Sequence, residues 1–158
     1  MRDELRENAR AALQAIRKAG VTRIVMLTGD NETTAQRVAR DVGGIDEVRA
    51  HLKPGDKAEA LKAFAARGEK VAMVGDGVND APALAEATVG VAMGAAGTDV
   101  ALETADVALM SDDLEKLAYA LSLARRYKSI ARQNIALSIV VVSVPVSYTH
   151  LTLPTSDL

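Results

Sequence analysis

The stretch of sequence that decides the fold is Lys70-Val71-Ala72-Met73-Val74-Gly75-Asp76-Gly77-Val78-Asn79-Asp80. Residues 70–74 form a short apolar run, which is typical of a buried strand in a parallel sheet. The run leads directly into a glycine-rich acidic loop, in which Asp76 and Asp80 can turn their carboxylates toward one point at the strand end. Carboxylate oxygens are the ligands that Mg²⁺ prefers. The stretch therefore predicts a magnesium site; the alternative is a turn that only caps the next helix.

The segments on both sides of this stretch alternate between helix and strand. Apolar residues at helical spacing, ended by glycines, predict helices over 3–18, 32–42, 54–66 and 80–87 and near 98–104. Short apolar runs predict strands over 23–27, 46–50, 70–74, 88–92 and 106–110. This alternation predicts an α/β fold with a doubly wound parallel sheet, in which ligands bind beyond the carboxyl ends of the strands.

Two further groups of residues fall near that edge of the predicted sheet. Thr28-Gly29-Asp30-Asn31 follows a strand and offers a hydroxyl and helix-terminal amides to a phosphate. Lys57 lies early in a predicted helix, where a cation opposes the helix dipole. Asn79 is placed to cap a helix or to bind phosphate. The alternatives are an ordinary capping turn for 28–31 and a solvated surface side chain for Lys57.

Composition excludes several classes of function. The 158 residues have a formal net charge of −2, which gives no electrostatic basis for nucleic-acid binding. The chain has no cysteine, so disulfides and thiolate metal sites are excluded. Hydrophobic residues make up 49% and aromatic residues only 3%, so the core must consist mostly of aliphatic side chains.

The C-terminal part follows a different pattern. Residues 113–133 are predicted to be helical, and residues 135–146 are almost uninterruptedly apolar. These twelve residues are fewer than the ~20 that cross a bilayer, but a basic cluster precedes them, as at a cytoplasmic membrane edge. We predict the start of a truncated transmembrane helix; the alternative is a buried core helix. Residues 147–158 resemble translated sequencing-adapter read-through and are predicted to be a non-native tail.

Three motifs, in this order and at these separations, resemble the phosphorylation domain of P-type ATPases, members of the haloacid-dehalogenase-like superfamily. They are Met26-Leu27-Thr28-Gly29-Asp30-Asn31, Lys53-Pro54-Gly55-Asp56-Lys57 and Gly75-Asp76-Gly77-Val78-Asn79-Asp80-Ala81-Pro82-Ala83-Leu84. Residues 91–106 and the basic helix before the apolar run are similar to the heavy-metal-transporting branch. The resemblance covers residues 3 to 145.

The resemblance implies a role for each matching residue. Thr28 and Lys57 would hold the phosphoryl group, and Asp76 and Asp80 would ligate Mg²⁺. Binding of phosphate and nucleotide would fall to the remaining residues, Gly29, Asp30 and Asn79, with Arg6 and Asp3 from a looser Asp-x-x-Arg element. The cofactors implied are Mg²⁺ and ATP. The implied partners are a transported divalent cation, favouring zinc, cadmium, cobalt or lead, and the cell membrane, with this domain on the cytoplasmic side of a multi-pass protein.

The sequence departs from this family at the nucleophile. The family's aspartate lies in an Asp-Lys-Thr-Gly-Thr motif, which this chain lacks. We therefore interpret the chain as a pump fragment that is inactive alone, with residues 1–112 from the phosphorylation domain, 113–146 as a linking helix and the start of a span, and 147–158 as the tail. The alternatives are a soluble phosphatase of the same superfamily and a non-catalytic module that binds Mg²⁺ or nucleotide.

Overall fold

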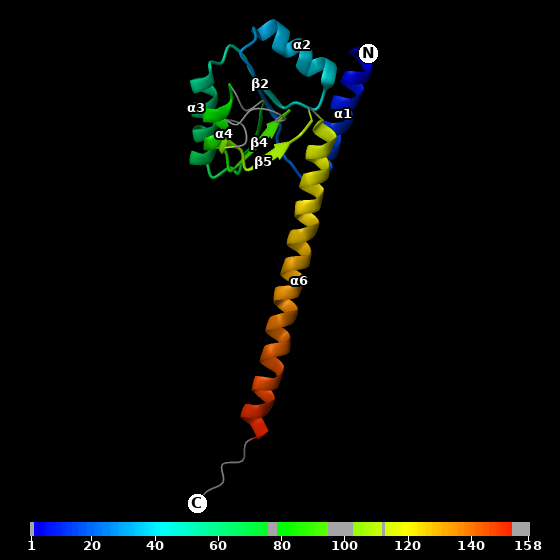
Figure 1. Ribbon diagram of the computed structural model, residues 1–158, viewed down its shortest axis with the longest axis vertical. Coiled ribbons are helices and arrows are strands. Elements are labelled where there is room, and N and C mark those ends of the chain that lie inside the picture. The colour runs from blue at the N-terminus through cyan, green and yellow to red at the C-terminus, as the bar shows by residue number, and fades with distance from the viewer. Residues whose placement is uncertain (1, 76–78, 95–102, 112, 153–158) are drawn as a thin grey trace, which may run out of the picture. The chain divides into compact units, whose positions relative to one another are not determined.

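A computed structural model describes residues 2–75, 79–94, 103–111 and 113–152. The chain divides into two compact units, residues 1–119 and 120–158. Helices and strands alternate along the first unit (Figure 1). The order is α1 (Arg2–Lys18), β1 (Val25–Leu27), α2 (Glu32–Val42), β2 (Glu47–Arg49), α3 (Pro54–Ala66), β3 (Ala72–Gly75), α4 (Ala81–Glu86), β4 (Val89–Met93), β5 (Val107–Leu109) and α6 (Leu114–Thr152). The predicted alternation is confirmed for these elements, and the helix expected near 98–104 falls largely outside the described residues.

The strands are parallel, as predicted, but they form two sheets instead of one. β1 pairs with β2, with Val25 opposite Glu47, while the second sheet has the order β3-β4-β5. In the described residues β1 and β3 each have one strand partner, so the backbone ladder is interrupted between them. The strands of the described residues thus do not form the single sheet that was expected, because local alternation predicts strands without saying which strands pair.

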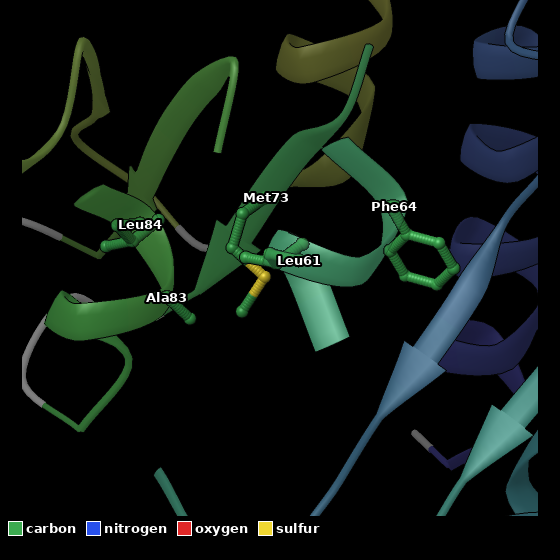
Figure 2. Packing of buried hydrophobic residues seen from close by; sticks show 5 residues of the cluster. All are labelled: Leu61, Phe64, Met73, Ala83 and Leu84. Atoms are coloured by element: carbon green, nitrogen blue, oxygen red, sulfur yellow. The ribbon is translucent and has the colours of Figure 1, made fainter. Parts of the chain in front are cut away.

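Side chains join the two sheets where backbone hydrogen bonds do not. A buried cluster consists of Leu61 and Phe64 of α3, Met73 of β3, and Ala83 and Leu84 of α4 (Figure 2). Val25 and Leu27 of β1 pack against this cluster, so the first sheet shares the core of the second. Burial of this apolar surface is the main force that holds α3 and α4 side by side over the sheets.

Charged side chains reinforce the same junction. The guanidinium groups of Arg23, Arg49 and Arg67 lie 5.3, 4.8 and 5.9 Å from the centre of the Phe64 ring. Cations at this distance from an aromatic face are attracted by its quadrupole. Glu47 accepts hydrogen bonds from Arg49 and from Arg23, and these two bonds hold the pKa of Glu47 below its usual value.

The ends of the helices follow from local chemistry. Asn31 caps α2 by accepting a hydrogen bond from the Thr34 N–H at 2.8 Å. Gly43 ends the same helix with a φ of 71°, in the left-handed region that favours glycine. Pro54 opens α3, where its fixed φ suits the first turn, and Asp56 accepts from the Lys53 N–H at 2.8 Å. These two helix starts agree with those predicted from the sequence.

The C-terminal helix α6 is 39 residues long and continues past residue 146 to Thr152. Its apolar side chains at Ile135, Leu137, Ile139, Val140 and Val141 are exposed. In the part of the chain that the structure describes, no helix combines the length and apolarity needed to cross a membrane. The predicted start of a transmembrane helix thus gains no support from the structure. The predicted division into 1–112, 113–146 and 147–158 stays a prediction.

Candidate functional site

The turn after β1 brings two of the predicted phosphate-binding residues into contact. The Thr28 hydroxyl donates to Asp30 Oδ2 and accepts from the Asp30 N–H, both at 3.1 Å. Gly29 lies between them, and a Cβ there would come within 3.2 Å of the Leu52 carbonyl oxygen. The turn therefore presents a hydroxyl and a carboxylate at the carboxyl end of β1, pressed against the segment that leads into α3.

Two backbone amides in the first turn of α2, the helix that follows this turn, already donate hydrogen bonds to side chains of the protein. Asn31 accepts from the Thr34 N–H at 2.8 Å, and Nε2 of His51 accepts from the Glu32 N–H at 3.4 Å. Helix N-terminal amides are common phosphate ligands, which is why the sequence suggested this role for them. In the structure these two amides already have partners, so a phosphate at this turn would depend on the Thr28 hydroxyl and on the remaining amides.

Lys57 and Asp80, the second group of predicted site residues, form an ion pair. Lys57 Nζ donates to Asp80 Oδ1 at 2.6 Å, and the two side chains are only 16% and 12% exposed. Lys57 comes from the first turn of α3, and Asp80 is the N-cap residue of α4. The alternative of a solvated surface lysine does not describe this position. A charge-assisted hydrogen bond with little water around it is stronger than an exposed one.

Gly75 at the end of β3 makes room for this carboxylate. A Cβ at position 75 would lie 2.5 Å from Asp80 Oδ2, 2.8 Å from its Cβ and 3.0 Å from its Cγ. These distances are below normal contact, so another residue at this position would displace the Asp80 side chain. The glycine of the acidic loop thus has a steric function that the sequence suggested only in general terms.

The side chains around Asp80 provide part of a binding site for a hard cation such as Mg²⁺. Mg²⁺ usually takes one or two carboxylates and completes its octahedron with water and phosphate oxygens. Asp80 supplies one carboxylate close to a lysine that can face a phosphate. In the described residues no three His, Asp or Glu side chains gather to hold a metal. Asp76, the other predicted ligand, lies outside the described residues, so the metal site stays a prediction.

The other predicted residues are placed as follows. Asn79 is exposed and directly precedes Asp80 at the start of α4. Asp3 and Arg6 belong to α1, and their side chains lie outside the described part of the structure. The expected roles of these three residues in binding phosphate or nucleotide stay predictions.

One residue near the site was missed by sequence reasoning. His51 is an isolated histidine in the sequence, so no motif singles it out. The structure places its ring against the first amide of α2. Its contact depends on a backbone conformation, a φ of 56°, that no local sequence pattern predicts for histidine.

Comparison with known proteins gives consistent results. The haloacid dehalogenase-like hydrolase family model matches residues 1–88. A probable cadmium-transporting ATPase of Listeria monocytogenes is 50% identical over 139 residues, which are 88% of this chain and 19% of that protein. A zinc-exporting P-type ATPase of Mycobacterium marinum is 52% identical over 141 residues, again 19% of its length. The chain thus spans about a fifth of the length of these curated relatives.

Solved structures show the same similarity in three dimensions. A zinc-transporting PIB-type ATPase in its E2·Pi state matches 89% of this chain with a TM-score of 0.79 and 40% identity, over 23% of its own length. The catalytic domain of the CPx-ATPase CopB-B matches 63% of this chain with a TM-score of 0.54 and 37% identity, over 38% of its own length. The predicted family resemblance is confirmed by these matches.

Proposed function

Because this chain belongs to the haloacid dehalogenase-like hydrolase family, we propose that it carries the Mg²⁺- and phosphate-binding half of the phosphorylation site of an ATP-driven heavy-metal pump. The observation that carries the proposal is the ion pair between Lys57 and Asp80, which concentrates an ammonium and a carboxylate at the sheet rim. An isolated pair of this kind would be expensive to bury for stability alone. Because Asp80 belongs to the acidic loop, a role of the pair in phosphoryl transfer would explain why it is buried.

Phosphoryl transfer requires mainly positioning and neutralisation of charge on the transferring group. Lys57 would stabilise the negative charge of the phosphoryl oxygens. Thr28 would donate a hydrogen bond to them in place of its present bond to Asp30 Oδ2. Asp76 and Asp80 would hold Mg²⁺, which bound to this site supplies further positive charge. Asn79, Gly29 and Asp30 would position phosphate and nucleotide, with Arg6 contributing to the nucleotide.

The nucleophilic aspartate would come from a segment outside this chain. The sequence has no Asp-Lys-Thr-Gly-Thr motif, so the chain alone is expected to form no aspartyl-phosphate. The free backbone edges of β1 and β3, in the described residues, support this proposal because an additional parallel strand can pair there. The length of the relatives, about five times that of the match, is consistent with such a segment.

The transported ion is proposed to be a divalent heavy-metal cation. The names of the relatives include cadmium-, zinc- and manganese-transporting ATPases, so similarity alone favours no single metal. The location proposed is the cell membrane, with this domain on the cytoplasmic side of a multi-pass protein. The basic residues that precede the apolar segment 135–146 support this orientation, since positive residues flank spans on that side.

Labelling with γ-³²P ATP tests the proposal in the full-length protein that contains this sequence. We expect a metal-dependent, hydroxylamine-sensitive phosphoenzyme that disappears when Mg²⁺ is removed with EDTA. Asp76→Ala should abolish it and Lys57→Ala should reduce it strongly. Lys62→Ala is the control, because Lys62 pairs with Glu86 on the same two helices but is 60% exposed.

Three outcomes would contradict the proposal. A normal phosphoenzyme level in Asp76→Ala would contradict the metal assignment. Wild-type turnover in a folded Lys57→Ala protein would contradict the role of the lysine. A hydroxylamine-sensitive adduct on the isolated chain would contradict its description as half of a site, and phosphatase turnover by that chain would favour a soluble phosphatase.

A further inference from the structure

His51 has an unusual backbone conformation close to the proposed phosphate site. Among the described residues it is the only one other than glycine with a positive φ, 56°. A side chain in this left-handed region is disfavoured by contact between its Cβ and the backbone. Such a conformation persists only where surrounding contacts hold it, and it is often found next to functional sites.

The contacts of this segment tie two parts of the site together. The His51 N–H donates to the Asp30 carbonyl oxygen at 2.8 Å, and the Leu52 N–H donates to the Thr28 carbonyl oxygen at 3.0 Å. The imidazole adds a third connection, because Nε2 accepts from the Glu32 N–H at 3.4 Å. The turn at 28–31 is therefore bound on both sides to residues 51 and 52, which lead directly into the start of α3.

The third contact is made by the ring itself, because Nε2 lies within hydrogen-bond distance of the N–H that opens α2. The left-handed backbone at position 51 is what turns the ring back toward this helix terminus.

We propose that His51 is a positioning residue that fixes the Thr28 turn relative to the helix carrying Lys57. The proposal rests on the proposed function, because it assigns Thr28 and Lys57 to the same phosphoryl group. His51 does not touch that group. It acts by keeping the turn in place, so that the Thr28 side chain stays at the carboxyl end of β1. Small errors in position lower the rate of a transfer reaction strongly.

A series of substitutions separates the backbone from the ring. His51→Gly adopts the positive φ without strain and removes the imidazole. His51→Asn tolerates the same φ and retains a hydrogen-bond acceptor. His51→Val opposes the φ because its branched Cβ is disfavoured there. His51→Gly and His51→Asn therefore test the role of the imidazole without backbone strain. His51→Val tests the role of the positive φ.

The first measurement is amide hydrogen exchange on this chain, which does not depend on any activity. In His51→Gly we expect exchange of the Glu32 amide to rise by about three- to tenfold, in line with the loss of one modest hydrogen bond. The Thr34 amide, which Asn31 caps, is the internal control and should be unchanged. His51→Asn should restore part of the protection. Wild-type exchange at Glu32 in His51→Gly would overturn the contact.

The second measurement is the rate of phosphoenzyme formation in the full-length protein. We expect His51→Gly to lower this rate by about tenfold with little change in the KM for ATP, and His51→Asn to recover most of it. A wild-type rate in His51→Gly, together with altered exchange, would overturn the positioning role. If the unsubstituted protein forms no phosphoenzyme, the proposed function fails, and the exchange data still confirm or overturn the contact.

Discussion

The ion pair between Lys57 and Asp80 allows a quantitative test of how the site is built. Lys57→Met removes the ammonium and keeps a side chain of similar length, while Asp80→Asn removes the charge of the carboxylate and keeps its shape. Each single substitution leaves one charged group without its partner in a mostly buried position. The double variant leaves neither charge.

The expected magnitudes follow from the exposure of the side chains. At 16% and 12% exposed, the pair is close to the buried limit, where removal of one partner costs about 3–5 kcal/mol. Because some water reaches both groups, we expect each single variant to lose about 3 kcal/mol of unfolding free energy. The double variant should lose less than the sum, which gives a coupling energy of about 2–3 kcal/mol.

The chain contains a matched control on the same two helices. Lys62 and Glu86 also connect α3 and α4, at 3.3 Å, but they are 60% and 40% exposed. Exposed pairs contribute at most about 1 kcal/mol and often less. Lys62→Met and Glu86→Gln should therefore change stability by no more than about 0.5 kcal/mol, with a negligible coupling energy.

Urea denaturation of this chain, followed by far-UV circular dichroism at pH 7 without Mg²⁺, measures all of these free energies. Thermal unfolding gives an independent reading, since about 3 kcal/mol corresponds to about 6–12 °C in a chain of this size. A coupling energy below about 0.5 kcal/mol for Lys57 and Asp80, equal to that of the control pair, would refute the argument. It would mean that the pair is solvated in solution.

Two further predictions concern stability. Gly75→Ala should lower the free energy of unfolding by about 1–3 kcal/mol, because the added Cβ would overlap Asp80. Gly55→Ala is the control, since position 55 has open space around it, and it should be neutral or slightly stabilising. Equal effects of the two substitutions in urea denaturation would contradict the steric role of Gly75. The pKa of Asp46 is lowered by the Ile24 N–H and then by Arg17. The contribution of Asp46 to the free energy of unfolding is therefore complete above the ordinary aspartate pKa of about 4. This contribution is lost as the pH falls through the lower pKa that Asp46 has in the folded protein. Asp46→Asn should be less stable at pH 7 and should show a flatter fall below about pH 4; unchanged slopes would contradict this assignment.

Much of the local structure could be predicted from the sequence. The helix over 32–42, the strand that ends at Gly75 and the start of α3 at Pro54 agree with the structure within a few residues. Their physical causes are local: apolar spacing, a capping side chain, a proline with a fixed φ and glycines at helix ends. The family resemblance depends on the same short motifs and was confirmed by the comparisons.

The arrangement of the site depended on contacts between distant residues. Lys57 and Asp80 are 23 positions apart, and either could have faced solvent. Their pairing follows from the packing of α3 against α4 around the buried cluster and from the space left by Gly75. His51 is a similar case, because its positive φ is imposed by contacts with Asp30 and Glu32 and not by its neighbours in sequence.

The sequence by itself determined the elements of this protein, the loops that are predicted to carry its chemistry, and its family, because each depends on interactions within a few residues. Only the tertiary structure decided that the strands form two sheets, that Lys57 is paired and mostly buried, and that α2 uses its first amides on His51 and Asn31. These features depend on which surfaces pack together. Periodicity along the chain predicts that a surface will be buried, but packing decides what it is buried against.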